Sequence, residues 1–97
     1  MELSLDDFAD WLLRHASEHV GQRGRYFDHP LARWLSERSG RLMGVDSAAG
    51  TYGQALCSPR CWRPLPWWAV RFAALMECPH FRAITGEEAF ALLVESL

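Results

Sequence analysis

The chain has 97 residues, of which 49% are hydrophobic and 23% are charged, and its formal net charge at pH 7 is −2. This length supports one hydrophobic core, so we expect a single globular domain over residues 1–97, and the composition excludes an intrinsically disordered chain. No run approaches the roughly 20 consecutive apolar residues that a membrane-spanning helix requires.

The start of the chain, MELSLDDFADWLL, is acidic and lacks the basic start and continuous apolar run of a secretory signal peptide. We therefore expect a cytoplasmic protein whose three cysteines are free thiols. The sequence contains no lysine and no asparagine, which indicates a GC-rich coding sequence and a bacterial or phage source. Nine of the ten arginines but four of the 12 acidic residues lie between Trp11 and Met76, so the middle of the chain is basic.

Helical spacing of apolar residues predicts a first helix over residues 5–20. Ser4 suits its N-cap, and His15 and His19 continue the apolar stripe toward Gly21, where the helix is expected to end. The sequence GQRGRYF that follows has two glycines and no periodicity, which predicts a loop.

A second helix is expected to begin at Pro30, because proline suits a first helical turn, and to end at Gly40. Two short runs then flank the turn-like sequence DSAAG, which predicts a β-hairpin. The three prolines of CSPRCWRPLP exclude regular structure over much of that segment, and the last of them suits the start of a third helix. The apolar stripe expected for the third helix comprises Trp68, Phe72, Leu75 and Met76.

The fourth helix has the strongest start signal, because Thr85 and Glu88 have the spacing of a capping box. We expect Pro79 to end the third helix and the sequence PHFRA to bridge to the fourth. The buried face expected for the fourth helix comprises Phe90, Leu93, Val94 and Leu97. The predicted fold is therefore α+β, a compact single domain of four short helices with one small β-hairpin between the second and third helices.

Enzymatic chemistry has little support in the sequence. There is no Gly-x-Ser-x-Gly motif, and the sequences GQRG and GTYG are too short to form a phosphate-binding loop. Cys78 and His80 resemble a catalytic pair, but a cysteine at the C-terminus of a helix faces the negative end of the dipole, which disfavours the thiolate. His15 and His19 have the i, i+4 spacing of a chelating pair but lack a third ligand and a base. We therefore expect no enzymatic activity and assign no catalytic residues.

A zinc site is an alternative that the cysteines raise. The residues with the side chains that zinc prefers are Cys57, Cys61, Cys78 and His80. Their spacing differs from the two-residue spacing of zinc knuckles, and Cys78 equally suits a small apolar position on the third helix. We therefore expect no bound cofactor and keep a zinc-stabilised domain as an alternative.

Arginine alternates with aromatic residues in the sequence RGRYF, a pattern that can pair with phosphates and stack on bases. The possible nucleic-acid-binding residues are Arg23, Arg25, Tyr26 and Phe27. A pI near 6.0 and the absence of lysine argue against such a partner. An accessory nucleic-acid-binding protein is therefore an alternative prediction.

The adjacent tryptophans Trp67 and Trp68 lead to the preferred prediction. Neighbouring side chains on a helix point about 100° apart, so a narrow buried stripe accepts one of the two rings. Trp68 shares its side with Phe72 and is expected to be buried, which leaves Trp67 at the edge of the core. The partner-binding surface predicted around it comprises Arg60, Trp62, Arg63, Trp67 and Arg71.

Tryptophan and arginine are typical of the energetic centres of protein interfaces. We therefore expect a small non-catalytic interaction protein, a regulator or inhibitor that binds a larger protein. The same composition is compatible with a homodimer. Trp62 and Trp67 could instead form an intramolecular lid over the core.

Overall fold

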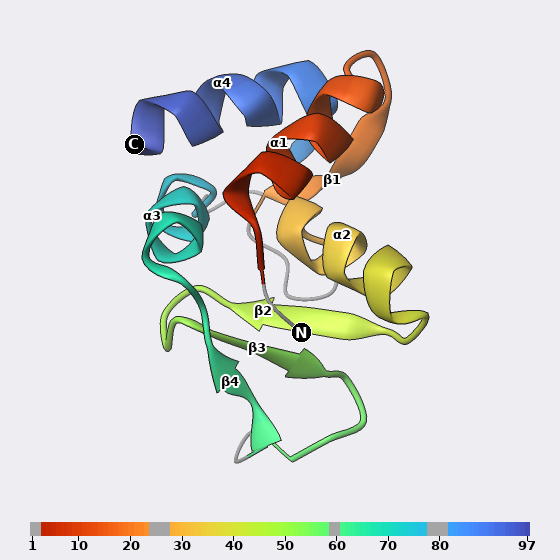
Figure 1. Cartoon of the computed structure of the whole chain (residues 1–97), viewed down its shortest axis with the longest axis vertical. Coiled ribbons are helices and arrows are strands. Elements are labelled where there is room, and N and C mark those ends of the chain that lie inside the picture. Colours follow the sequence, from red (N-terminus) through yellow and green to blue (C-terminus); the bar gives the residue numbers. More distant parts are fainter. Residues whose placement is uncertain (1–2, 24–27, 59–60, 78–81) are drawn as a thin grey trace.

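Helices and short strands are interspersed along the chain, and Figure 1 shows the helices gathered above a three-stranded sheet. The computed structural model describes residues 3–23, 28–58, 61–77 and 82–97. Its elements are α1 (Leu5–Arg14), β1 (His19–Arg23), α2 (Pro30–Ser39), β2 (Met43–Asp46), β3 (Thr51–Gln54), β4 (Arg63–Pro64), α3 (Trp67–Leu75), β5 (Arg82–Thr85) and α4 (Gly86–Ser96). The Cα radius of gyration, 12.0 Å, is that of a compact single domain.

The strands form two separate antiparallel sheets, one that pairs β1 with β5 and one with the order β2-β3-β4. The predicted α+β class with four helices is confirmed. The prediction that one hairpin holds all the strand structure is wrong, because the described residues form five strands in two sheets. The additional strands β1, β4 and β5 are paired by tertiary contacts between distant segments, which local sequence patterns do not reveal.

The first helix is shorter than predicted, since α1 ends at Arg14 and residues 19–23 form β1. Val20 is buried while β1 pairs with β5, so tertiary pairing overrides the helical pattern here. Gly21 allows this path because its φ is 151° and a Cβ there would come within 2.6 Å of the Asp28 carbonyl oxygen. His15 and His19 therefore do not share a helix face.

The proline-rich segment also contains regular structure that the sequence analysis excluded. Arg63 and Pro64 form β4, at the edge of the three-stranded sheet, where a residue without an N–H is tolerated. Pro66 is the N-cap of α3, so the predicted start of this helix is confirmed. The helix itself ends at Leu75, before Pro79, which lies outside the described residues.

The predicted helix ends at Gly40 and Thr85 are confirmed. Gly40 adopts the left-handed conformation, with φ 72°, at the end of α2. Thr85 and Glu88 make both hydrogen bonds of the capping box. The predicted buried face of α4 is partly wrong, since Val94 and Leu97 are exposed. The residues of α4 that are buried are Gly86, Ala89, Leu93 and Ser96.

This change of face in α4 follows from the close approach of α4 to the end of α1. A Cβ on Gly86 would overlap the backbone carbonyl oxygens of Leu12 and His15. The Gly86 N–H also donates to the Glu18 carbonyl at 3.0 Å. The N-terminus of α4 is thereby fixed against the α1–β1 connection, and its small residues face inward.

Phe8 lies at the centre of the aromatic core. Its ring centroid is 5.0 Å from that of Trp34, 5.7 Å from that of Trp68 and 5.3 Å from that of Phe72. Trp11 packs at 6.2 Å from the same ring. The core therefore encloses three of the five tryptophans of the chain. None of the described helices is long and apolar enough to cross a membrane.

Candidate functional site: the exposed face of α3

Helix α3 separates the two adjacent tryptophans as predicted. Trp68 is 4% exposed and packs against Phe8, whereas Trp67 is 61% exposed. The prediction that Trp68 is buried and Trp67 is not is therefore confirmed. Burial of the second ring would require a helix enclosed on more than one side.

The rest of α3 is unusual for a helix with a solvent-facing side. Its sequence, WWAVRFAAL, contains one charged residue, Arg71, and an apolar helix of this kind is normally enclosed on all sides. Here α3 lies at the margin of the molecule beside the β2–β3 turn (Figure 1). The exposed residues at helical spacing on it, called the α3 face below, are Trp67, Val70, Arg71 and Ala74.

The charge on and beside the α3 face comes from arginines that have no ion-pair partner among the described residues. Neither Arg63 nor Arg71 takes part in an ion pair within the described segments. The acidic groups of the adjoining turns have partners, since Asp46 accepts hydrogen bonds from the Ala48 and Ala49 amides and Glu77 accepts one from Ser47. Arg71 therefore gives the α3 face a positive charge.

Trp62 does not share the exposure of Trp67. Its ring lies against Gly53 of β3, where a Cβ would overlap the indole, and its Nε1 donates to the Gln54 carbonyl at 3.1 Å. The ring is partly buried, so Trp62 covers the sheet within the molecule. Of the two roles predicted for this residue, the geometry favours the intramolecular lid.

The predicted arginines are distributed over different sites. Arg63 is opposite Tyr52 in the β3–β4 pairing and lines a recess of about 190 Å³ on this sheet. Arg71 lies one helical turn from Trp67 on α3. Arg60 lies outside the described residues. The structure therefore supports Trp67 and Arg71 as one continuous surface, to which Val70 adds apolar area that the sequence analysis did not include.

The residues of the nucleic-acid prediction are mostly not described. Arg25, Tyr26 and Phe27 lie outside the described residues. Arg23 is the last residue of β1, and its backbone pairs with that of Arg82 in β5. The prediction of a nucleic-acid surface on these residues stays a prediction.

The cysteine and histidine ligands proposed for zinc are likewise incompletely described. Cys57 and Cys61 are exposed free thiols, whereas Cys78 and His80 lie outside the described residues. Within the described segments no group of three His, Cys, Asp or Glu side chains is placed to hold a metal ion. His15 instead contacts Glu18, with 2.7 Å between Nδ1 and Oε2.

A groove of about 400 Å³ between α1 and α2 was missed by the sequence analysis. Two pairs of its lining residues bind each other, since Trp11 Nε1 donates to Glu37 at 2.8 Å and Arg38 donates to Asp7 at 3.0 Å. Arg38 also lies over the Trp34 ring, 5.3 Å from its centroid. These contacts engage part of the polar lining of the groove, to which Asp10 and Arg14 also contribute.

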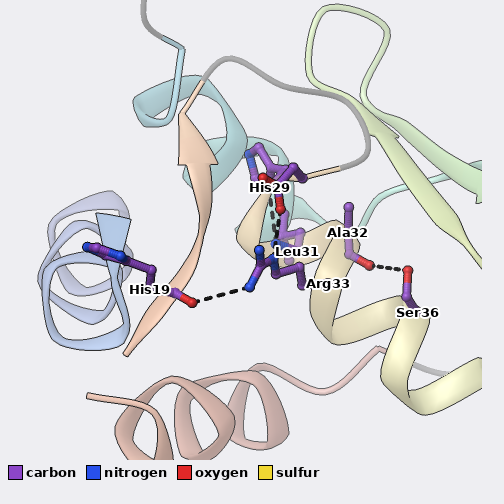
Figure 2. A network of polar contacts seen from close by, with 7 residues as sticks. His19, His29, Leu31, Ala32, Arg33 and Ser36 are labelled. Carbon is purple, nitrogen blue, oxygen red and sulfur yellow. Dashed lines mark hydrogen bonds and ion pairs between the residues drawn. The ribbon is translucent and has the colours of Figure 1, made fainter. Parts of the chain in front are cut away.

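His29 is a buried titratable group beside the core. Its Nδ1 accepts a hydrogen bond from the Leu31 amide at 3.1 Å at the start of α2, as Figure 2 shows. Its Nε2 has no hydrogen-bond partner among the described residues, and the ring packs edge-on against Phe72 at 5.9 Å between centroids. Burial lowers the pKa of His29 to about 4, so the ring is neutral at pH 7. The residue therefore has a structural role as a helix cap.

No protein-family model matches this chain, and no curated protein or solved structure is significantly similar to it. Its function therefore has to be argued from the chemistry of the α3 face.

Proposed function

We propose that this chain is a small non-catalytic interaction protein of the cytoplasm that regulates or inhibits a larger protein by docking through the α3 face. The observation that carries the proposal is the 61% exposure of Trp67 on a helix with one charged residue. A fully buried tryptophan removes roughly 150–250 Å² from water, so burial of the exposed part of this ring would contribute strongly to an interface. Val70, which is 39% exposed, extends the same apolar area.

The partner is expected to present an apolar pocket with carboxylates at its rim. Arg71 lies beside Trp67 on the α3 face and has no acidic partner among the described residues. Guanidinium groups pair with carboxylates through two parallel hydrogen bonds, and a ring of such contacts around a buried tryptophan is typical of interface hot spots. Arg63 adds positive charge on the neighbouring strand.

A second copy of the same chain fits the α3 face less well. A twofold symmetric dimer formed through this helix would bring the same patch of each copy together. Arg71 would then lie near the Arg71 of the other copy, with no carboxylate on the α3 face to separate the two charges. A different protein with an acidic rim avoids this repulsion.

The test is affinity capture from the native host with the full chain and three variants, Trp67→Ala, Arg71→Glu and Leu56→Ala. Leu56 is fully exposed on the β3–β4 connection and is the matched control for loss of an exposed apolar side chain. We expect one protein to be retained by the unchanged chain and by Leu56→Ala, and to be lost with both α3 variants. Circular dichroism is expected to show all four chains folded.

Three outcomes would contradict the proposal. The first is a captured protein that binds equally well to the Trp67→Ala chain. The second is sedimentation as a dimer that the same substitution converts to a monomer. The third is capture of nucleic acid in a salt-dependent manner, lost on substitution of Arg23 and Arg25, which would favour the nucleic-acid alternative.

A further inference from the structure

The connection between β3 and β4 carries two cysteines three residues apart, within the sequence CSPRC. Cys57 and Cys61 are both exposed free thiols. Both line the recess of about 190 Å³ to which Met43, Tyr52 and Arg63 also contribute. The two thiols therefore open onto one shared space instead of lying on opposite sides of the connection.

Hydrogen bonds hold both cysteines in position. The Cys57 amide donates to the Gln54 carbonyl at 3.0 Å, and the Cys61 amide donates to the Ser58 carbonyl at 2.8 Å. Trp62 Nε1 donates to the same Gln54 carbonyl at 3.1 Å and so joins the residue after Cys61 to the end of β3. Antiparallel pairing of Tyr52 with Arg63 closes the base of the connection.

The two thiols also influence each other. A hydrogen bond between the two thiols, followed by the charge of an ionised Cys57, raises the pKa of Cys61. Cys61 therefore binds its proton more tightly than a free cysteine does, which suits the thiol that acts second in an exchange reaction.

We propose that Cys57 and Cys61 form a thiol–disulfide exchange site that closes to an intramolecular disulfide on reaction with a small anionic disulfide, for which oxidised glutathione is the probe. Arg63 lines the same recess and supplies a positive charge for the carboxylates of such a reagent. Exposed pairs of this kind form labile disulfides that thiols reduce again.

The reaction balances without a further oxidant. The Cys57 thiolate attacks one sulfur of the reagent RSSR, which forms a mixed disulfide and releases RS⁻. Cys61 then loses its proton, and its thiolate attacks Cys57 Sγ and releases the second RS⁻. The two RS⁻ groups take up the two thiol protons, so the chain loses two electrons and the reagent becomes two thiols.

The test uses the full chain with Cys78→Ser, which leaves Cys57 and Cys61 as the only thiols of the three cysteines in the sequence. The chain is equilibrated with mixtures of reduced and oxidised glutathione, then quenched with acid and weighed by mass spectrometry. The same equilibrium is measured in concentrated urea, because a short unfolded segment also forms some disulfide. We expect the folded chain to lose two hydrogens and to favour closure over the unfolded chain by about tenfold or more.

Trp62→Phe tests whether the fold holds the two cysteines in place for closure. Phenylalanine keeps a ring against Gly53 but cannot donate a hydrogen bond to the Gln54 carbonyl. The variant is expected to lower the preference for closure in the folded chain while leaving that in urea unchanged. A stable glutathione adduct on either cysteine without closure would overturn the proposal. Equal closure constants in the folded and unfolded chains would also overturn it, because the fold would then contribute nothing.

Discussion

The indole ring of Trp62 occupies the space that a side chain at Gly53 would fill. A Cβ on Gly53 would overlap the ring, and the ring nitrogen donates to the carbonyl of the next residue, Gln54, at 3.1 Å. The Trp62 ring therefore packs directly against the backbone of Gly53 in β3. This packing explains a glycine inside a strand, where a residue without a side chain otherwise weakens the sheet.

Gly53→Ala is expected to lower the free energy of unfolding by about 1–3 kcal/mol, because the added methyl group forces Trp62 out of its place. Urea unfolding followed by circular dichroism measures this change. The control is the same substitution in a Trp62→Ala chain, where the obstructing ring is absent and Gly53→Ala is expected to cost much less. Equal costs in the two backgrounds would contradict the contact between these two residues.

The adjacent tryptophans of α3 make a matched pair for a second prediction. Trp68→Ala removes a ring that packs against Phe8 and is expected to lower the free energy of unfolding by about 3–5 kcal/mol. Trp67→Ala removes a ring that is 61% exposed and is expected to change it by less than about 1 kcal/mol. The measurement is urea unfolding of both variants. A large loss of stability in Trp67→Ala would show that this ring serves the fold, and the proposed docking role would lose its basis.

The sequence predicts those parts of the fold that depend on neighbours along the chain. Gly40 and the pair Thr85 and Glu88 end or begin helices through local hydrogen bonds, and each prediction is confirmed. The exposure of Trp67 and the burial of Trp68 follow from helical geometry alone. These features need no knowledge of distant segments.

Features that depend on distant segments were missed. His19 and Val20 continue a helical pattern in the sequence, yet they lie in β1 because β5, more than 60 residues later, pairs with it. Pro64 argues against a strand until its place at a sheet edge is known. The same holds for the candidate site. Helical spacing indicates the exposure of Trp67, but the position of Trp62 over Gly53 depends on contacts with β3 that the local sequence does not reveal.

The capping box at the start of α4 provides a third prediction. The Thr85 hydroxyl accepts a hydrogen bond from the Glu88 amide at 3.2 Å, and the Glu88 carboxylate accepts one from the Thr85 amide at 3.1 Å. Thr85→Ala is expected to lower the free energy of unfolding by about 1 kcal/mol, and Thr85→Ser, which keeps the hydroxyl, by less. Thermal unfolding of the two variants compares them directly. Equal losses would mean that the methyl group of Thr85, and not its hydroxyl, stabilises the helix.

A fourth prediction follows from the buried ring of His29. Burial lowers the pKa of His29 from 6.5 to about 4 in the folded chain, whereas the unfolded chain binds the proton near pH 6.5. Above pH 6.5 neither state is protonated at this ring, and its neutral form is fully compatible with the fold. As the pH falls from 6.5 toward 4 the unfolded state alone gains the proton, so the free energy of unfolding declines, by about 3 kcal/mol in total from this group. Below pH 4 both states bind the proton and the loss stops growing.

His29→Asn isolates this contribution, because asparagine is a favourable N-cap for the Leu31 amide and does not titrate. The measurement is urea unfolding of both chains at several pH values between 7 and 4. The stability of the unchanged chain is expected to fall more steeply than that of His29→Asn over this range. The acidic residues, including Glu88, whose pKa is lowered by its hydrogen bonds with Thr85, are common to both chains and cancel in the comparison. Parallel pH profiles would show that His29 gains its proton without loss of stability, which is incompatible with a buried Nε2 that lacks a partner in the described part of the chain.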